Sequence, residues 1–186
     1  MNTDSAPLRL HLGCGKRYLP GFVHVDIADF PHIDHRARVD KLPFVADESV
    51  ELIYCSHMLE YRDRFQVMNV LAEWRRVLKP DGVLRLAVPD FDALIEVYKR
   101  TGDITKILGP LFGRMDVGLE EPIYHRTVYN LASLREVLES AGFKDVRGWD
   151  WRKVFPPGYD DHSQAYFPHM DKENGILVSL NVEATR

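Results

Sequence analysis

The chain has 186 residues, of which 45% are hydrophobic, a size and composition that suit a single domain with a core of its own. Its 24 Lys and Arg residues against 28 Asp and Glu residues give a formal net charge of −4, which disfavours nucleic acid as the main partner because proteins that bind phosphate backbones are usually basic. We find no secretory signal at the start and no apolar run of the roughly 18 residues that span a membrane. We therefore expect one cytoplasmic domain over residues 1–186, whose two cysteines, Cys14 and Cys55, are reduced thiols.

Strands and helices are predicted to alternate along the chain. Strands are expected over residues 8–12, 22–27, a short piece before Asp40, 50–55, 82–88, around Val146 and over 176–182. Apolar residues recur at helical spacing over residues 67–78, between Asp63 and Pro80, and over residues 131–141, which end at Gly142. This alternation predicts an α/β layer fold with a largely parallel sheet.

In open sheets of this kind, ligands bind beyond the carboxyl ends of the strands. The residues that follow the predicted strands are therefore candidates for a site: Gly13, Cys14, Gly15, Asp26, Ser56, His57, Glu60 and Asp90. Glycines after a first strand let a ligand approach the backbone, and an acidic residue after the next strand can accept hydrogen bonds from ribose hydroxyls. Together they indicate a cofactor that carries a nucleoside.

The spacing argues against a dinucleotide cofactor. Tyr18 stands where the third glycine of G-x-G-x-x-G would be, and Asp26 follows Gly13 by only 13 residues, where a dinucleotide site has its acidic residue about 20 residues on. Residues 16–21 are too few for a full crossover helix, so a pyrophosphate cradle is poorly supported.

At this level the sequence resembles small bacterial class I S-adenosylmethionine (SAM)-dependent methyltransferases of the subgroup with a shortened first crossover. The resemblance covers residues 8–146, and the order of its blocks is more specific than any one of them. The blocks are residues 10–15, 21–27, 40–44, 52–60, 77–84 and 134–143. It departs from the family at Tyr61, where relatives have histidine after glutamate, and at Asp81, where they have glycine.

The resemblance implies a Rossmann-like class I methyltransferase fold, with a mostly parallel seven-stranded sheet, an antiparallel last strand over residues 176–182 and helices on both faces. It also implies roles for single residues. Those implied to bind SAM are Gly13, Cys14 and Gly15 at the methionine end, Asp26 at the ribose, Ile27, Asp40 and Leu42 at the adenine, and Ser56 with His57 at the sulfonium.

Three side chains at this edge are candidate catalytic bases for an acceptor that must lose a proton: His57, Glu60 and Asp90. Structural roles compete with this interpretation, since a histidine can simply bond to backbone and Glu60 can complement a helix dipole. His125, ahead of the second predicted helix, either faces the acceptor or has a capping or surface role.

Residues 149–171 form an aromatic segment in which six of 23 residues are Phe, Tyr or Trp. We expect a long loop that either binds the acceptor or packs on the sheet edge or on a second subunit. Histidines and aspartates cluster faintly around residues 32–35 and 160–171, but neither cluster has convincing metal-ligand spacing, so no metal is expected.

The sequence therefore predicts a SAM-dependent methyltransferase that acts on a small-molecule or glycan-like acceptor. The alternative is a non-catalytic relative that binds SAM and serves as a partner subunit, which Tyr61 and the short connection over residues 16–21 favour. A homodimer also stays open. A nicotinamide-linked oxidoreductase fails on the glycine spacing and on the lack of a Tyr-x-x-x-Lys pair.

Overall fold

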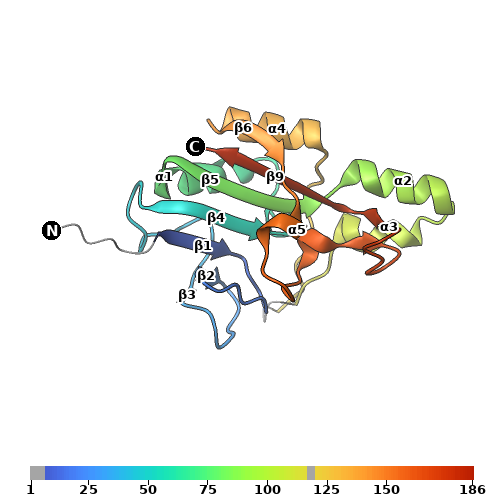
Figure 1. Cartoon of the computed structure of the whole chain (residues 1–186), viewed down its shortest axis with the longest axis horizontal. Helices are drawn as coiled ribbons and strands as arrows, with labels where there is room; N and C mark the ends of the chain where they lie inside the picture. Colours follow the sequence, from blue (N-terminus) through green and yellow to red (C-terminus); the bar gives the residue numbers. More distant parts are fainter. Residues whose placement is uncertain (1–6, 117–119) are drawn as a thin grey trace.

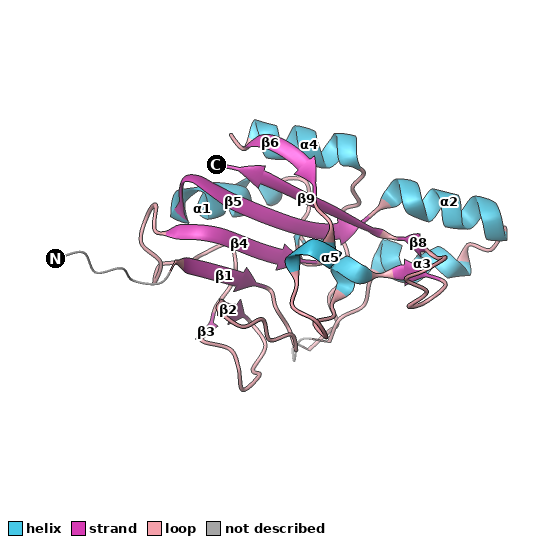
Figure 2. Cartoon of the chain, viewed as in Figure 1, coloured by secondary structure: helices cyan, strands magenta, loops and turns pink. Residues whose placement is uncertain are grey.

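A computed structural model describes residues 7–116 and 120–186, and a seven-stranded sheet forms its centre (Figures 1 and 2). The strand order is β3-β2-β1-β4-β5-β9-β6, and of these seven strands β9 is the one that runs opposite to the other six. The strands are β1 (Leu8–Leu12), β2 (Val23–Asp26), β3 (His35–Arg36), β4 (Val50–Ser56), β5 (Leu78–Pro89), β6 (Lys144–Gly148) and β9 (Ser179–Thr185). The predicted fold class, with its antiparallel last strand, is confirmed.

Helices α1 and α4 supply most of the helical side chains in the main core. Their apolar faces, which include Trp74, Leu134 and Leu138, pack with Leu10 and Ile53 of the sheet in one fully buried cluster. The helices are α1 (Val67–Val77), α2 (Phe91–Thr101), α3 (Thr105–Phe112), α4 (Leu131–Ser140) and the short α5 (Trp151–Val154), with single 3₁₀ turns η1 (Leu59–Tyr61) and η2 (His162–Gln164). Figure 2 shows α2 and α3 extending past the carboxyl end of β5.

The other face of the sheet is covered by aromatic rings. The connection between β1 and β2 contains no helix, as its length predicts. Side chains alternate along a strand, so His11 and Tyr54 point away from the α1 side. Their ring centroids lie 5.0 Å apart, and Tyr54 also packs against Trp149 and Phe155 at 6.0 and 5.3 Å. Burial lowers the pKa of His11 to about 3, so this imidazole is neutral.

The structure corrects two of the expected strands and adds two helices that were not predicted. The last predicted strand is divided at Val178, where it changes partner: the Val178 amide donates to the Ala165 carbonyl and the Val178 carbonyl accepts from the Asp90 amide. Residues 176–177 (β8) pair with β7 (Tyr166–Phe167) in a separate two-stranded sheet, and only β9 joins the main sheet. The fifth strand begins at Leu78, four residues earlier than expected, and α2 and α3 had no prediction.

The order of the strands reverses between β1 and β4, which are hydrogen-bonded neighbours. This is where an open α/β sheet leaves a crevice at the carboxyl ends of its strands. The residues after β1, β2 and β4 therefore meet at one place.

Candidate active site

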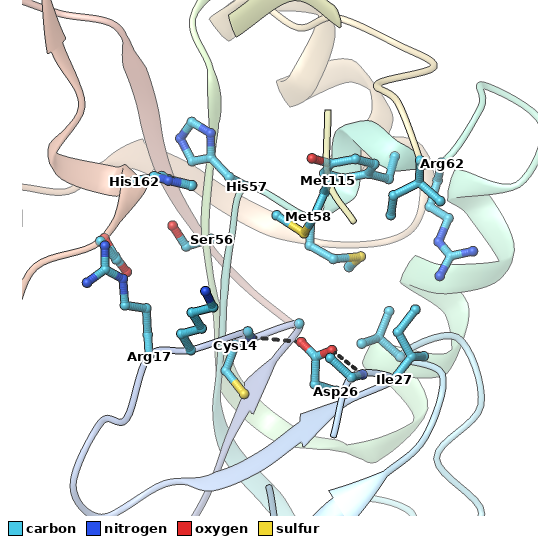
Figure 3. Close-up of a pocket in the computed structure, with 18 of the residues that line it drawn as sticks. Cys14, Arg17, Asp26, Ile27, Ser56, His57, Met58, Arg62, Met115 and His162 are labelled. Carbon is cyan, nitrogen blue, oxygen red and sulfur yellow. Dashed lines mark hydrogen bonds between the residues drawn. The ribbon is translucent and has the colours of Figure 1, made fainter. Parts of the chain in front are cut away.

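The glycine turn after β1 and the side chain of Asp26 form one structural unit. Gly13 and Gly15 have φ angles of 64° and 54°, in the left-handed region that favours glycine. The amide of Gly15 donates to Asp26 Oδ2 and the amide of Ala28 donates to Oδ1, both at 2.8 Å. These two bonds fix the carboxylate at the end of β2 (Figure 3). Each of its oxygens keeps a lone pair that can accept a further hydrogen bond.

A cavity of about 750 Å³ opens at this edge of the sheet, within the range of roughly 300–1,000 Å³ that is usual for small-molecule sites. Seven of the residues predicted to bind a cofactor line it: Gly13, Cys14, Gly15, Asp26, Ile27, Ser56 and His57. The far wall comes from residues 61–66, 114–116 and 123–126, and includes Met115, Tyr124 and Arg126, none of which carried a sequence signal.

The other two predicted cofactor residues lie outside this lining. Leu42 is fully buried in the main core, and its amide donates to Glu73 Oε1 at 2.7 Å. Asp40 accepts two hydrogen bonds from Arg38, at 2.9 and 2.7 Å, and these bonds lower the pKa of its carboxyl group. The side chains that reach the cavity from this loop are Arg38 and Val39 instead.

His57 lines the cavity, but both of its ring nitrogens face protein groups. Its Nε2 lies 2.9 Å from Ser179 Oγ and its Nδ1 lies 3.5 Å from Glu60 Oε1. Asn181 Nδ2 donates to the Ser163 carbonyl, so Asn181 Oδ1 is the group that accepts the Ser179 hydroxyl. Ser179 Oγ must then accept from His57, which assigns the hydrogen to Nε2 and leaves a lone pair on Nδ1.

A second histidine presents a lone pair to the same carboxyl group. His125 Nδ1 lies 3.0 Å from the Pro110 carbonyl, which can only accept, so Nδ1 carries the hydrogen and Nε2 does not. This Nε2 lies 3.7 Å from Glu60 Oε1. Glu60 is completely buried, and neither carboxyl oxygen has a hydrogen-bond partner among the described residues.

Glu60 is therefore a neutral acid at neutral pH. Burial raises the pKa of its carboxyl group to about 8. If Glu60 were ionised, its carboxylate would face the lone pairs of His57 Nδ1 and His125 Nε2, and none of these three groups would carry a proton. This repulsion is costly because the dielectric constant of the interior is low. Glu60 does not line the cavity, so it contacts an acceptor only through other residues.

Asp90 has a structural role in this fold. It is the N-cap of α2, and its Oδ1 accepts from the amides of Asp92 and Ala93 at 3.1 and 3.4 Å. Burial raises the pKa of its carboxyl group. Asp90 is absent from the lining of the cavity, so of the three catalytic candidates only His57 reaches it.

Residues 149–171 do not form the expected loop, because α5, η2 and β7 lie within them. The segment packs on the sheet: Trp149 Nε1 donates to the Leu86 carbonyl at 2.9 Å, and the Tyr54 hydroxyl donates to Asp161. Asp161 and His162 nevertheless reach the cavity. The ring of His162 has no hydrogen bond within the described part of the chain, and its centroid lies 5.3 Å from that of His57 (Figure 3).

Comparisons with known proteins agree with this geometry. Residues 20–86 match the family model of a methyltransferase domain, whereas no curated protein sequence matches the chain. A SAM-dependent methyltransferase from Archaeoglobus fulgidus superposes with a TM-score of 0.57 at 15% identity, over 98% of this chain and 87% of that one. The 1,6-didemethyltoxoflavin-N1-methyltransferase from Burkholderia thailandensis, solved with S-adenosylhomocysteine, gives 0.56 at 14% identity, over 97% and 71%. A methyltransferase from Haloferax volcanii in complex with the Trm112 activator gives 0.53 at 15%, over 100% and 84%.

The chain therefore has the fold of class I SAM-dependent methyltransferases, and residues 20–86 of it match a methyltransferase domain. The residues at the glycine turn suit SAM as a cofactor. A Cβ on Gly15 would meet no atom within 4 Å, so the backbone there is open to a ligand, whereas a Cβ on Gly13 would lie 2.6 Å from Met58 Cγ. The two glycines therefore serve different needs: Gly13 allows close packing and Gly15 leaves space.

Cys14 and Cys55 are both buried and unpaired. Leu12 is the partner of Cys55 in the β1–β4 pairing, so Cys14 and Cys55 lie near the same carboxyl edge. Burial raises the pKa of the Cys14 thiol to about 12, and it raises that of Cys55 as well.

Within residues 7–116 and 120–186, no group of three His, Cys, Asp or Glu side chains is placed to hold a metal ion. In the same residues no helix is long and apolar enough to cross a membrane.

Proposed function

We propose that this protein transfers the methyl group of SAM to a small-molecule or glycan-like acceptor bound in the same cavity. The observation that carries the proposal is the continuity of the cavity. It runs from the unit formed by the glycine turn and Asp26 to a second wall built by residues 114–116 and 123–126, so cofactor and acceptor would share one enclosure.

The near end of the cavity would hold the cofactor. Asp26 would accept hydrogen bonds from the ribose hydroxyls, since each of its oxygens has accepted only one amide bond. Ile27 and Val39 would provide apolar contact for the adenine, and Cys14 and Gly15 would lie along the methionine portion.

SAM supplies an activated methyl group on a positively charged sulfur, so the task left to the protein is mainly to align the acceptor with that group. A base is required only when the acceptor must lose a proton. His57 is a poor base in this arrangement because its Nε2 donates to Ser179 and its Nδ1 faces Glu60. His162 suits the role better, because its ring lies on the cavity wall with no hydrogen-bond partner among the described residues.

Calorimetry with SAM and S-adenosylhomocysteine tests the cofactor site. Asp26→Ala should weaken binding about 10- to 100-fold, because charged hydrogen bonds contribute about 1.5–3 kcal/mol. Asp29→Ala is the matched control, since Asp29 is exposed and lies outside the cavity. Equal affinities for the two variants would move the ribose contact away from Asp26.

Release of S-adenosylhomocysteine in a screen of small-molecule and glycan acceptors tests catalysis. With an acceptor that is turned over, His162→Ala should lower kcat, whereas His169→Ala, an exposed histidine of the same segment outside the cavity, should not. SAM binding without turnover of any acceptor would favour the alternative, a non-catalytic partner subunit. The Haloferax neighbour, which was solved with an activator protein, shows that a chain of this fold can assemble with another.

A further inference from the structure

The wall of the cavity carries more positive than negative side chains, although the whole chain has a net charge of −4. Its basic residues are Lys16, Arg17, Arg38, Arg62, Arg114 and Arg126, and its acidic residues are Asp26, Asp116 and Asp161. A basic cavity in an acidic protein indicates a ligand that is negatively charged.

The carboxylates near the cavity leave much of this positive charge unbalanced. Asp26 accepts two backbone amides, and Asp161 accepts the hydroxyl of Ser163 at 2.5 Å and that of Tyr159 at 3.1 Å. Arg38 is paired with Asp40, which lies outside the lining. Arg17 lies 3.7 Å from Asp160.

Three arginines of the far wall, Arg62, Arg114 and Arg126, have no ion pair among residues 7–116 and 120–186. Arg62 Nε is buried without a hydrogen-bond partner. Burial lowers the pKa of the Arg62 guanidinium group, nearby Asp40 raises it, and the nearby cations Arg38 and Arg126 lower it further. Like charges held together in this way favour an anion between them.

SAM would not supply the missing negative charge. It carries a sulfonium and an ammonium group against one carboxylate, and that carboxylate belongs to the methionine end, beside the glycine turn. Figure 3 shows Arg17 and Arg62 at opposite sides of the cavity, so Lys16 and Arg17 are the cations within reach of the methionine end. The arginines of the far wall are left for the second ligand.

We infer that the methyl acceptor carries an oxyanion, a carboxylate or a phosphate, which binds to Arg62, Arg114 and Arg126. Guanidinium groups match the two oxygens of such anions with paired hydrogen bonds. The inference rests on the proposed function, because it assigns these arginines to the acceptor of that reaction.

The test is a titration of protein saturated with S-adenosylhomocysteine, at constant ionic strength, with inorganic phosphate in one arm and malonate in the other. Wild type should bind at least one of the two anions, and the tighter arm identifies the preferred oxyanion. The double variant Arg114→Gln/Arg126→Gln should lose at least tenfold in that affinity while keeping its affinity for S-adenosylhomocysteine. Arg64→Gln, which removes one positive charge from an exposed arginine outside the cavity, should behave as wild type.

Absence of binding in both arms, or equal anion affinity in wild type and the double variant, would overturn the inference and leave the proposed function intact. Failure of wild type to bind S-adenosylhomocysteine would instead overturn the proposed function. Arg62 is left unchanged in these variants because it is half-buried and its removal would disturb the packing around η1.

Discussion

Glu60→Gln should stabilise the protein at neutral pH. The carboxyl group of Glu60 is buried between two nitrogen lone pairs, on His57 and His125, and it keeps its proton until about pH 8 in the folded chain. Glutamine has the same shape and no charge in either state. Its amide group has two hydrogens and can donate one to each histidine nitrogen. The protonated carboxyl group has one hydrogen and can donate to only one of the two nitrogens.

The magnitude follows from proton linkage. The pKa of Glu60 is raised from its ordinary value of 4.5 in the unfolded chain to about 8 in the folded protein. Between these values the unfolded chain binds fewer protons than the folded one, so stability falls as pH rises, by about 1.4 kcal/mol per pH unit. The raised pKa of Glu60 therefore lowers the free energy of unfolding by less than about 1 kcal/mol at pH 5 and by about 3 kcal/mol at pH 7, and this loss is nearly constant above pH 8.

Urea denaturation of wild type and Glu60→Gln at pH 5, 7 and 8.5 measures this difference, and the change with pH separates the ionisation of Glu60 from any effect of packing. The variant should gain on wild type as the pH rises. Glu136→Gln, which makes the same substitution at an exposed carboxyl group on α4 with no ion pair in the described structure, is the matched control. A difference for Glu60→Gln that is flat with pH, or that grows toward low pH, would refute the protonated state assigned to Glu60.

Two further results are expected. Gly13→Ala should lower the free energy of unfolding by about 1–3 kcal/mol, since its φ is 64° and the new Cβ would lie 2.6 Å from Met58 Cγ; a midpoint of urea denaturation equal to that of wild type would contradict this. Cys14 and Cys55 are buried thiols with raised pKa values, so a thiol reagent should react with two groups in urea and only slowly in the native protein, and a count of zero in urea without reductant would show that they are oxidised.

The parts of the fold that could be predicted are those whose sequence pattern reflects a large buried face. Helix α1 buries five residues at helical spacing, and α4 begins with a capping box between Asn130 and Ser133. In contrast, α2 buries only Leu94 and Val97, and α3 buries only Ile107, so neither has a clear apolar stripe. The division of the last strand depends on a hydrogen bond from Val178 to a distant carbonyl, which no local pattern could indicate.

The candidate site divides in the same way. Gly13, Gly15 and Asp26 could be found because they directly follow strands whose order the fold class fixes. Arg126 and His162 could not, because they come from segments that are remote in sequence and are brought to the cavity by packing of the chain. A sequence gives the composition of such segments, but not which of their side chains face inward.

The neutral state of Glu60 and the positive wall of the cavity belong to one argument about charge. The amides of Arg126 and Thr127 donate to the backbone carbonyl of Glu60, and the Glu60 carboxyl group lies 3.7 Å from His125 Nε2, so this carboxyl group lies beside the segment that supplies Arg126. If it were ionised, it would add a negative charge there. Because burial and two lone pairs keep it protonated at neutral pH, Glu60 adds no negative charge there, which agrees with the inferred anionic acceptor. Nearby Tyr61 and Tyr129 stay neutral, since burial raises the pKa of each hydroxyl to about 12.

Malonate, which is fully ionised above pH 7, should therefore bind less tightly to wild type at pH 9 than at pH 7, because Glu60 loses its proton near pH 8. The affinity of Glu60→Gln should stay constant over the same range, since the variant has no charge to gain. The loss in wild type and its absence in the variant are both required: a decline of equal size in the two proteins would place the titrating group elsewhere and separate Glu60 from the charge balance of the cavity.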